Sequence, residues 1–392
     1  MANTITAYVP TIIARTIPIL RETLAFITRV TTDFDTEFAS IGNSLQIPVT
    51  AQLSASDITP SNTAPAMTDI APTSVSLTLN KFKRAPFSVA ETDLNQMMRN
   101  TDFIPAHLEE GARAIARQIE DDLFLQAKNI PYFVGTPGTS PFSSNLSTIA
   151  AAAKSMNDTL ASDKRTMLLS NTAVYNANQL GNLTQSFQRG GAEYLNTTQL
   201  GLLQGFDCQR ASRVPTFTAG TITTGLIAKA STSQPVGTTA IVCTTAASTG
   251  ACALVPGDII VFSGDGPSSG VNQSTYVVTA AATQASAATD VTVNIYPPKK
   301  VALVGSETIT VKATNEVNLG FDRGAFALGM RAPRNPERAL NVSVPFADNG
   351  PGGTGMTFAL NFVPNYWAET LEIVALYGVT TLRPERAVRM AG

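Results

Sequence analysis

The sequence predicts an α+β fold in which one long helix and a group of strands are interrupted by a separate β-rich domain. Three observations support this prediction. Residues 371–377 are almost entirely apolar, residues 104–128 carry apolar side chains at helical spacing, and residues 218–315 contain several short strand patterns with very little charge. A chain of 392 residues is long enough for two or three domains of roughly 100–200 residues each.

The apolar run near the C-terminus predicts a strand that is buried on both faces. Nearly every position from residue 371 to 377 is apolar, and Glu372 is the exception. A short continuous apolar run between turn signals is typical of such a strand. Gly378 and Pro384 bound it here, and Pro384 is expected to end the hydrogen-bond pairing.

The N-terminal segment carries a narrow apolar stripe that predicts a short helix. Its members recur at three- and four-residue spacing, at Ile13, Ile17, Leu20, Leu24 and Ile27. Pro18 would start or kink this helix. Two interpretations stay open, because the stripe could pack on the chain's own core or form an arm that lies on a neighbouring copy.

Residues 45–92 predict a long two-stranded hairpin with an irregular tip rich in Pro, Ser and Thr. An isolated hairpin is only marginally stable in water, so this one must lie on its own body or on another copy. Lys81, Lys83 and Arg84 fall on the returning strand. These charges either protect a strand edge from aggregation or form ion pairs with a neighbouring copy.

Residues 104–128 give the strongest helix prediction, with a length of about 37 Å at 1.5 Å per residue. The apolar stripe includes Leu108, Ile115 and Ile119, and Pro105 suits the first turn. Charged residues lie largely off this stripe. Among them, Arg113, Arg117 and Glu120 are candidates for contact with a neighbouring copy.

Residues 145–215 predict mixed helices and strands, with a helix start at Asn171 and Thr172. Residues 218–315 differ in composition, since Thr, Ala, Val and Gly dominate there. Six short strand patterns at roughly ten-residue spacing predict an antiparallel barrel or sandwich. They are "GLIAKA", "TTAIVCTT", "DIIVFSG", "STYVVTAA", "DVTVNIY" and "ETITVKA", the third fed by a turn at Pro256, Gly257 and Asp258.

The low content of charged residues favours an oligomer, and the small net charge argues against general electrostatic binding to nucleic acid. Charged residues make up 14% of the chain, against about 25% in an average soluble protein. The net charge of −2 provides no global attraction to phosphate or to an anionic membrane. Three cysteines without a C-x-x-C pair argue against a disulfide framework or a zinc site, and no signal peptide or membrane span is evident.

No residue pattern indicates catalysis, and we expect no catalytic, cofactor-binding or metal site. The single histidine, His107, has no nucleophile motif to serve. A G-x-G-x-x-G match begins at Gly350, but a strand-like segment follows it where a dinucleotide site needs a helix. The acidic group at residues 120–122 is expected to be a solvated face or to pair with a partner.

Two segments resemble the major capsid proteins of tailed bacteriophages. They are the tail "LEIVALYGVTTLRPERAVRM" and the segment "NLGFDRGAFALGMRAP", which begins at Asn318. The subgroup they look most like is the short-tailed Salmonella-phage coat type, in which a β-domain is inserted into the core. The segment "VPGDIIVF" resembles part of that inserted domain, whereas the short loop at residues 231–239 lacks the acidic residues of the relative.

This resemblance implies the tailed-phage major capsid fold and a division of the chain into named parts. They are an N-terminal arm (1–35), an extended hairpin loop with peripheral strands (36–95), a spine helix (96–145), an axial domain (146–217 and 317–392) and an inserted β-barrel (218–316). The last segment also contains the closing peripheral strand. The basic cluster from Arg383 to Arg389, with Glu385 inside it, is expected to form salt bridges between subunits, although each is weak at a surface. Arg383 and Glu385 therefore join the candidates for contact between subunits.

The function that the resemblance implies is self-assembly into pentamers and hexamers of an icosahedral shell around double-stranded DNA. Scaffolding protein and a portal are the partners expected from the resemblance, with assembly in the host cytoplasm and a final place in the virion. Two alternatives stay open. One is an encapsulin-like compartment, which would generally lack the inserted β-domain; the other is a β-rich surface or adhesin protein, which the long helix argues against.

Overall fold

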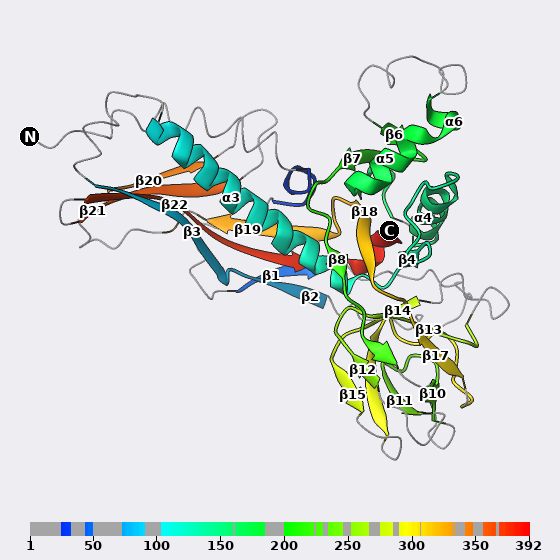
Figure 1. The fold of residues 1–392 in the computed structure, drawn as a ribbon. Coiled ribbons are helices and arrows are strands. Elements are labelled where there is room, and N and C mark those ends of the chain that lie inside the picture. Colours follow the sequence, from blue (N-terminus) through cyan, green and yellow to red (C-terminus); the bar gives the residue numbers. More distant parts are fainter. Residues whose placement is uncertain are drawn as a thin grey trace, which may run out of the picture.

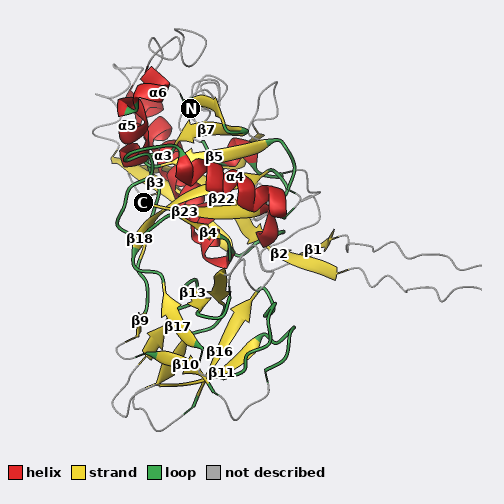
Figure 2. Cartoon of the chain, turned by 90° about the vertical axis from the view of Figure 1, so that its right-hand side faces the viewer, coloured by secondary structure: helices red, strands yellow, loops and turns green. Residues whose placement is uncertain are grey.

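A computed structural model describes residues 25–32, 44–49, 73–90, 103–159, 161–184, 200–222, 225–229, 234–245, 252–265, 275–284, 290–305, 307–331, 333, 342–347, 356–365 and 368–392. Figure 1 shows a long sheet with a helix along it, a second part that carries the smaller helices, and a barrel beneath that part. Figure 2, turned by 90°, places the barrel strands below the helices and apart from the β1–β2 hairpin.

The long sheet is built around β22 (Ala368–Thr381). This strand pairs antiparallel with β3 (Lys81–Ala90) on one edge, and with β21 (Thr357–Asn365) and then β19 (Phe326–Arg331) on the other. The strand β20 (Val342–Ala347) extends the sheet beyond β21. Residues 371–378 are all buried, as the apolar run predicts.

The strand β22 continues through Gly378, which bounds the apolar run, and its pairing ends shortly before Pro384, as the sequence predicts. A Cβ at Gly378 would lie 2.1 Å from the carbonyl oxygen of Thr78, so the chain crosses the sheet here closely enough that only glycine fits. Gly378 therefore marks the point within β22 at which the backbone of residues 78–79 approaches the strand closely. The strand ends at Thr381, and η5 (Pro384–Arg386) follows.

The long helix α3 (Phe103–Leu125) continues into a short 3-10 turn, η3 (Gln126–Asn129), which matches the predicted range of 104–128 closely. It lies along β22 and β3 in Figure 1. Its buried stripe of Ala112, Ile115, Ile119 and Leu123 shares one core with Leu371 and other residues of β22. Sheet and helix thus bury each other's apolar faces.

The predicted hairpin is only partly correct. The strands β1 (Ser44–Val49) and β2 (Thr73–Thr78) pair antiparallel, but the returning strand breaks after Thr78 and β3 pairs with β22 instead. Leu77 and Leu79 approach Gly329 closely at the break. This tertiary contact, which strand periodicity does not encode, places Lys81, Lys83 and Arg84 in the long sheet and not on the hairpin.

A second sheet runs in the order β4-β23-β18-β5-β7-β6, and β8 pairs with β18. The strands are β4 (Phe133–Val134), β23 (Ala387–Ala391), β18 (Asn315–Asp322), β5 (Arg165–Leu169), β7 (Phe206–Arg210), β6 (Gly201–Leu203) and β8 (Thr216–Phe217). The helices of this part are α4 (Ser147–Asp158), α5 (Asn171–Gln179) and α6 (Gly181–Thr184). The helix α5 is capped by Ser170, one residue before the predicted start, because the Ser170 hydroxyl accepts a hydrogen bond from the Ala173 amide.

The six predicted strand patterns of residues 218–315 form one closed antiparallel barrel, in the order β10-β11-β16-β14-β13-β17. Its strands are β10 (Leu226–Ala228), β11 (Ala240–Thr245), β16 (Val291–Tyr296), β14 (Thr275–Val278), β13 (Ile259–Phe262) and β17 (Thr308–Val311). A three-stranded sheet of β9 (Thr221–Ile222), β12 (Cys252–Leu254) and β15 (Ala282–Gln284) packs against it. These last strands are too short for periodicity to reveal.

The described part of the N-terminal segment packs on the chain's own core. Phe26, Ile27 and Val30 are buried around η2 (Ile27–Arg29), and the Phe26 ring lies 4.9 Å from the ring of Phe124. This agrees with the first of the two interpretations for Ile27. The remaining members of the stripe, from Ile13 to Leu24, lie outside the described residues.

Candidate subunit interface

The candidate interface residues lie on β3, on α3, and in or just before η5, and several of their side chains make contacts within the chain. Lys81 on β3 is the most constrained of them. Its Nζ lies 2.7 Å from Asp122 Oδ1 on α3, and the Tyr377 hydroxyl of β22 donates a 2.6 Å hydrogen bond to Asp122 Oδ2. Burial and the neighbouring Asp122 carboxylate raise the pKa of Tyr377, so its hydroxyl keeps its proton. This cluster binds helix to sheet.

Lys83 and Arg84 project toward solvent from β3. The Arg84 side chain is 70% exposed, and its Nη1 lies 3.4 Å from Glu372 Oε2 on β22. The other oxygen of Glu372 accepts a 3.1 Å hydrogen bond from the amide of Asn361. Most of the Arg84 surface is therefore available for other contacts. An exposed ion pair of this kind contributes little to stability.

Arg113 and Arg117 both contact Glu110 on the outer side of α3. The distances are 3.3 Å and 2.9 Å, and all three side chains are between 37% and 54% exposed. The three residues form one charged ridge along the helix, at three- and four-residue spacing. Their predicted part in contacts between subunits is untested.

Glu120 departs from the expected solvated face, since only 3% of the residue is exposed. It lies beneath the N-terminal segment, where the Phe26 amide donates a hydrogen bond to it. Burial raises the pKa of Glu120 to about 7, an effect that this hydrogen bond opposes. The neighbouring Asp121 points the other way and forms a bidentate pair with Arg213.

Arg383 and Glu385 are half-buried near the end of the chain. The Arg383 amide donates a 3.2 Å hydrogen bond to the carbonyl oxygen of Ala325, which fixes the turn before η5. Burial raises the pKa of Tyr132 to about 12, and the Glu385 charge adds to this shift. Glu385 thus lies near Tyr132, and part of its surface remains exposed.

Arg389 was expected to join its neighbours in salt bridges between subunits, and this prediction is wrong. The residue is 2% exposed. Its Nη2 donates to the Gly257 carbonyl at 2.8 Å and its Nε donates to the Ile130 carbonyl at 3.0 Å. The guanidinium also lies 5.5 Å from the centre of the Phe217 ring. Arg389, on β23, therefore joins the second sheet to the turn that begins the barrel strand β13.

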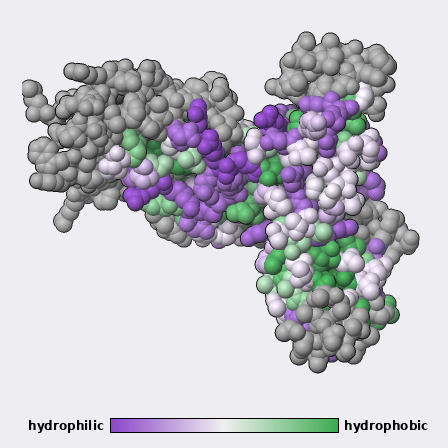
Figure 3. Space-filling view, viewed as in Figure 1, coloured by the Kyte–Doolittle hydropathy of each residue, from purple (hydrophilic) through white to green (hydrophobic). Residues whose placement is uncertain are grey.

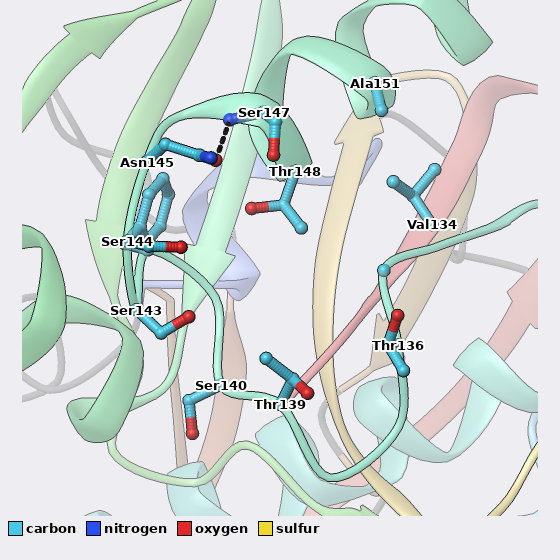
Figure 4. Close-up of a pocket in the computed structure, with 12 residues that line it drawn as sticks. Val134, Thr136, Thr139, Ser140, Ser143, Ser144, Asn145, Ser147, Thr148 and Ala151 are labelled. Atoms are coloured by element: carbon cyan, nitrogen blue, oxygen red, sulfur yellow. Dashed lines mark hydrogen bonds between the residues drawn. The ribbon is translucent and has the colours of Figure 1, made fainter.

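A cavity of about 430 Å³ lies between the loop after β4 and the start of α4. Figure 4 shows mainly serine and threonine side chains around it, with the Asn145 side chain accepting a 2.9 Å hydrogen bond from the Ser147 amide. None of its lining residues is charged, and none is a histidine or cysteine. A serine or threonine hydroxyl needs a neighbouring base to become a nucleophile, so this lining does not form a catalytic group.

Other reactive side chains are also dispersed in the part of the chain that the structure describes. No three side chains of His, Cys, Asp or Glu gather there in an arrangement that could hold a metal ion. No disulfide joins the three cysteines, all of which are buried, and burial raises the pKa of Cys243 to about 12. The His107 side chain and the glycine-rich segment that begins at Gly350 lie outside the described residues.

Comparison with solved structures identifies this arrangement of elements. A structure of Mycobacterium phage Che8 matches 94% of this chain and 90% of its own chain, with 13% sequence identity and a TM-score of 0.52. The chain has the tailed-phage major capsid fold.

Two other solved structures are less similar to this capsid fold. The capsid structure of the cyanophage P-SCSP1u matches 94% of the chain and 88% of its own, at 11% identity and a TM-score of 0.49. A virus-like particle from Pyrococcus furiosus matches 96% and 98%, at 6% identity and a TM-score of 0.39. No protein-family model and no curated protein sequence matches the chain.

The capsid fold, including its barrel, confirms the predicted architecture, whereas the short-tailed Salmonella-phage subgroup is not confirmed and stays a prediction. The boundaries of the predicted domains also stay predictions. Sequence reasoning missed the buried roles of Asp122 and Arg389. The apolar residues on both sides of Arg389 in "AVRMA" are the one signal that could have indicated its burial.

Proposed function

We propose that this chain is a major capsid protein, which assembles into pentamers and hexamers of an icosahedral shell around double-stranded DNA. The observation that supports this most strongly is the likeness to the phage Che8 structure over nine-tenths of both chains. A likeness of that extent includes the long sheet, the spine helix and the smaller helices, so it is not a shared local motif.

The surface of the chain supports assembly. Several large apolar side chains are exposed, and Figure 3 shows hydrophobic residues gathered over the barrel. Val304 is 85% exposed and Val236 62% exposed in this region, while Leu202 on β6 is 76% exposed. Only 14% of the residues are charged. A chain of this composition gains by covering part of its surface with identical neighbours.

The exposed charges on β3 and α3 are the best candidates for contacts between subunits. We propose that Lys83, Arg84, Arg113 and Arg117 form ion pairs across the interface, since their side chains extend from the long sheet and its helix. Lys81 and Glu120 act inside the subunit and affect assembly only through its shape. Arg383 and Glu385 would position the closing strand next to an interface.

The contents and partners of the shell follow from the same proposal. A net charge of −2 is compatible with a container in which DNA moves freely, because phosphate contacts would bind the DNA to the wall. Scaffolding protein and a portal are the proposed assembly partners. The host cytoplasm is the proposed site of assembly, and the virion is the proposed final location.

We propose no enzymatic activity. No helix in the described residues has both the length and the apolar character that crossing a bilayer requires.

Two alternatives remain. An encapsulin-like compartment would use the same fold to enclose an enzyme, and the closed barrel argues against it because encapsulins generally lack an inserted domain at this point. A β-rich surface protein is disfavoured by the 23-residue helix α3 that lies along the long sheet.

The test is to express the chain with and without the neighbouring phage genes and to examine the product by negative-stain electron microscopy. The proposal expects closed shells with the neighbouring genes, and rings, spirals or irregular shells without them. Shells that contain a cargo enzyme would favour the compartment. A monodisperse monomer under both conditions would contradict both shell functions.

A further inference from the structure

A lysine and an aspartate are buried together inside the barrel. The Lys299 side chain is 0% exposed and the Asp265 side chain 1% exposed, and Lys299 Nζ contacts Asp265 Oδ2. Asp265 follows β13, and Lys299 follows β16. The pair thus joins two segments that are separated by β14, β15 and β16 along the chain. Full burial of both charges is costly unless the surroundings compensate for the lost water.

The walls of this site are aromatic. Lys299 Nζ lies 4.3 Å from the centre of the Phe262 ring and 5.0 Å from that of Tyr276. The two rings pack edge to face, with centres 5.5 Å apart. The Tyr276 hydroxyl hydrogen-bonds the Asp265 carboxyl group. Lys299 is also held by its backbone, because its amide donates to Thr238 and its carbonyl accepts from Gly237.

The environment disfavours the charged form of Lys299. Burial in an apolar site lowers the pKa of Lys299, against the attraction of Asp265 and Glu307. Transfer of one proton from the ammonium to the carboxylate would give an amine and a carboxylic acid, neither of which needs hydration as a charge. An amine held against a carboxylic acid, away from water, has the two groups from which an amide bond forms.

We propose that Lys299 and Asp265 form an intramolecular isopeptide bond in the folded barrel. The Nζ lone pair attacks Asp265 Cγ, a C–N bond forms and a C–O bond breaks. One water molecule leaves, made from the acid hydroxyl and one amine proton. The Tyr276 hydroxyl is placed to donate a hydrogen bond to the carboxyl oxygen on which negative charge develops during attack. No oxidant or reductant is involved.

The same barrel contains a matched pair that should not react. Lys229 Nζ contacts Asp290 Oδ2 in the same way, but these side chains are 33% and 43% exposed. Water reaches both side chains there, so this pair lacks the enclosed site in which an amine and a carboxyl group could condense. The two pairs have the same residue types and differ mainly in burial and in the aromatic walls.

An isopeptide bond here would link the end of β13 covalently to the segment between β16 and β17. No disulfide joins the two cysteines of the barrel, Cys243 and Cys252. A link between distant segments reduces the freedom of the unfolded chain, as a disulfide does. The barrel would resist unfolding even where its contacts with the body are lost.

The test is mass spectrometry of the purified full chain under denaturing, reducing conditions, followed by a protease digest. The proposal expects an intact mass lower than the sequence mass by one water molecule, and a branched peptide that joins Lys299 to Asp265. Peptides that contain Lys229 and Asp290 should be unlinked. Recovery of Lys299 and Asp265 in separate unmodified peptides would overturn the proposal and leave an ordinary buried ion pair.

Two variants test the chemistry. Lys299→Met should abolish the branched peptide and restore the full mass. Tyr276→Phe keeps the ring and removes the hydroxyl, so the bond should form more slowly by about 100-fold, as for loss of one hydrogen-bond donor to a developing negative charge. Formation at the wild-type rate in Tyr276→Phe would contradict the role of the hydroxyl. The wild-type measurement decides on the bond itself even if a variant fails to fold.

Discussion

At the scale of single residues, buried charges hold together parts of the chain that are far apart in sequence. Asp122 on α3 contacts Lys81 on β3 and Tyr377 on β22. Arg389 reaches the carbonyl oxygens of Ile130 and Gly257. Such groups are stable only while every partner is present, because a buried polar atom without a partner is costly. They therefore specify how the elements meet.

Replacing Arg389 by methionine should strongly destabilise the chain. Two buried carbonyl groups would lose their donor, at about 1–3 kcal/mol each. Thermal unfolding of Arg389→Met, measured in the same assembly state as the wild type, should show a clearly lower midpoint. The control is Arg113→Met on the exposed ridge of α3, which should change stability by about 0.5 kcal/mol or less. Equal effects of the two variants would contradict the assignment.

Glu120 should make stability depend on pH. The pKa of its carboxyl group is raised to about 7 in the folded chain, from an ordinary value of 4.5. The folded state therefore holds this proton more tightly. The contribution to stability is present below pH 4.5 and is lost as the pH rises through about 7, with a total of about 3 kcal/mol.

Glu120→Gln should remove this dependence and unfold at a higher temperature than the wild type above pH 7. Midpoints of thermal unfolding between pH 5 and pH 8 would measure the effect. The matched control is Glu110→Gln on the same helix, where the carboxylate is 54% exposed and no such change is expected. A pH dependence that persists unchanged in Glu120→Gln would refute the explanation.

At the scale of elements, the long sheet depends on one glycine where two segments cross. Gly378→Ala would place a methyl group 2.1 Å from the Thr78 carbonyl oxygen, and neither backbone can move without breaking strand pairing. We expect a loss of stability of about 1–3 kcal/mol or more. Gly111→Ala on α3 meets only ordinary contacts and should stabilise by about 0.5–1 kcal/mol. Opposite shifts in the unfolding midpoint would support this account.

The elements also show what sequence patterns can predict. The barrel strands and α3 were predictable because local periodicity encodes their burial, as in Val291, Val293 and Ile295 of β16. The break between β2 and β3 was not, because it depends on the contact of Leu77 with Gly329. The burial of Glu120 likewise depends on an N-terminal segment far away in sequence. The periodicity of a segment predicts its own secondary structure and buried face, but not which other element packs against it.

At the scale of the whole molecule, the chain combines a long sheet, a compact second sheet and a barrel, as Figure 1 shows. The residues that bind these parts together are buried, while the charged ridge on α3 and the exposed apolar residues of the barrel face outward. Internal contacts thus define the shape of the subunit, and the outer surfaces remain for neighbours. A shell subunit needs this division, because identical contacts must recur around closed rings.

The most direct test of the capsid proposal is a cryo-electron-microscopy reconstruction of the particles that the chain forms. The account predicts a closed icosahedral shell into which this fold fits as five-fold and six-fold rings. It also predicts that Lys83, Arg84, Arg113 or Arg117 will lie at contacts between subunits. Preparations that contain only monomers, or filaments without closed rings, would contradict it.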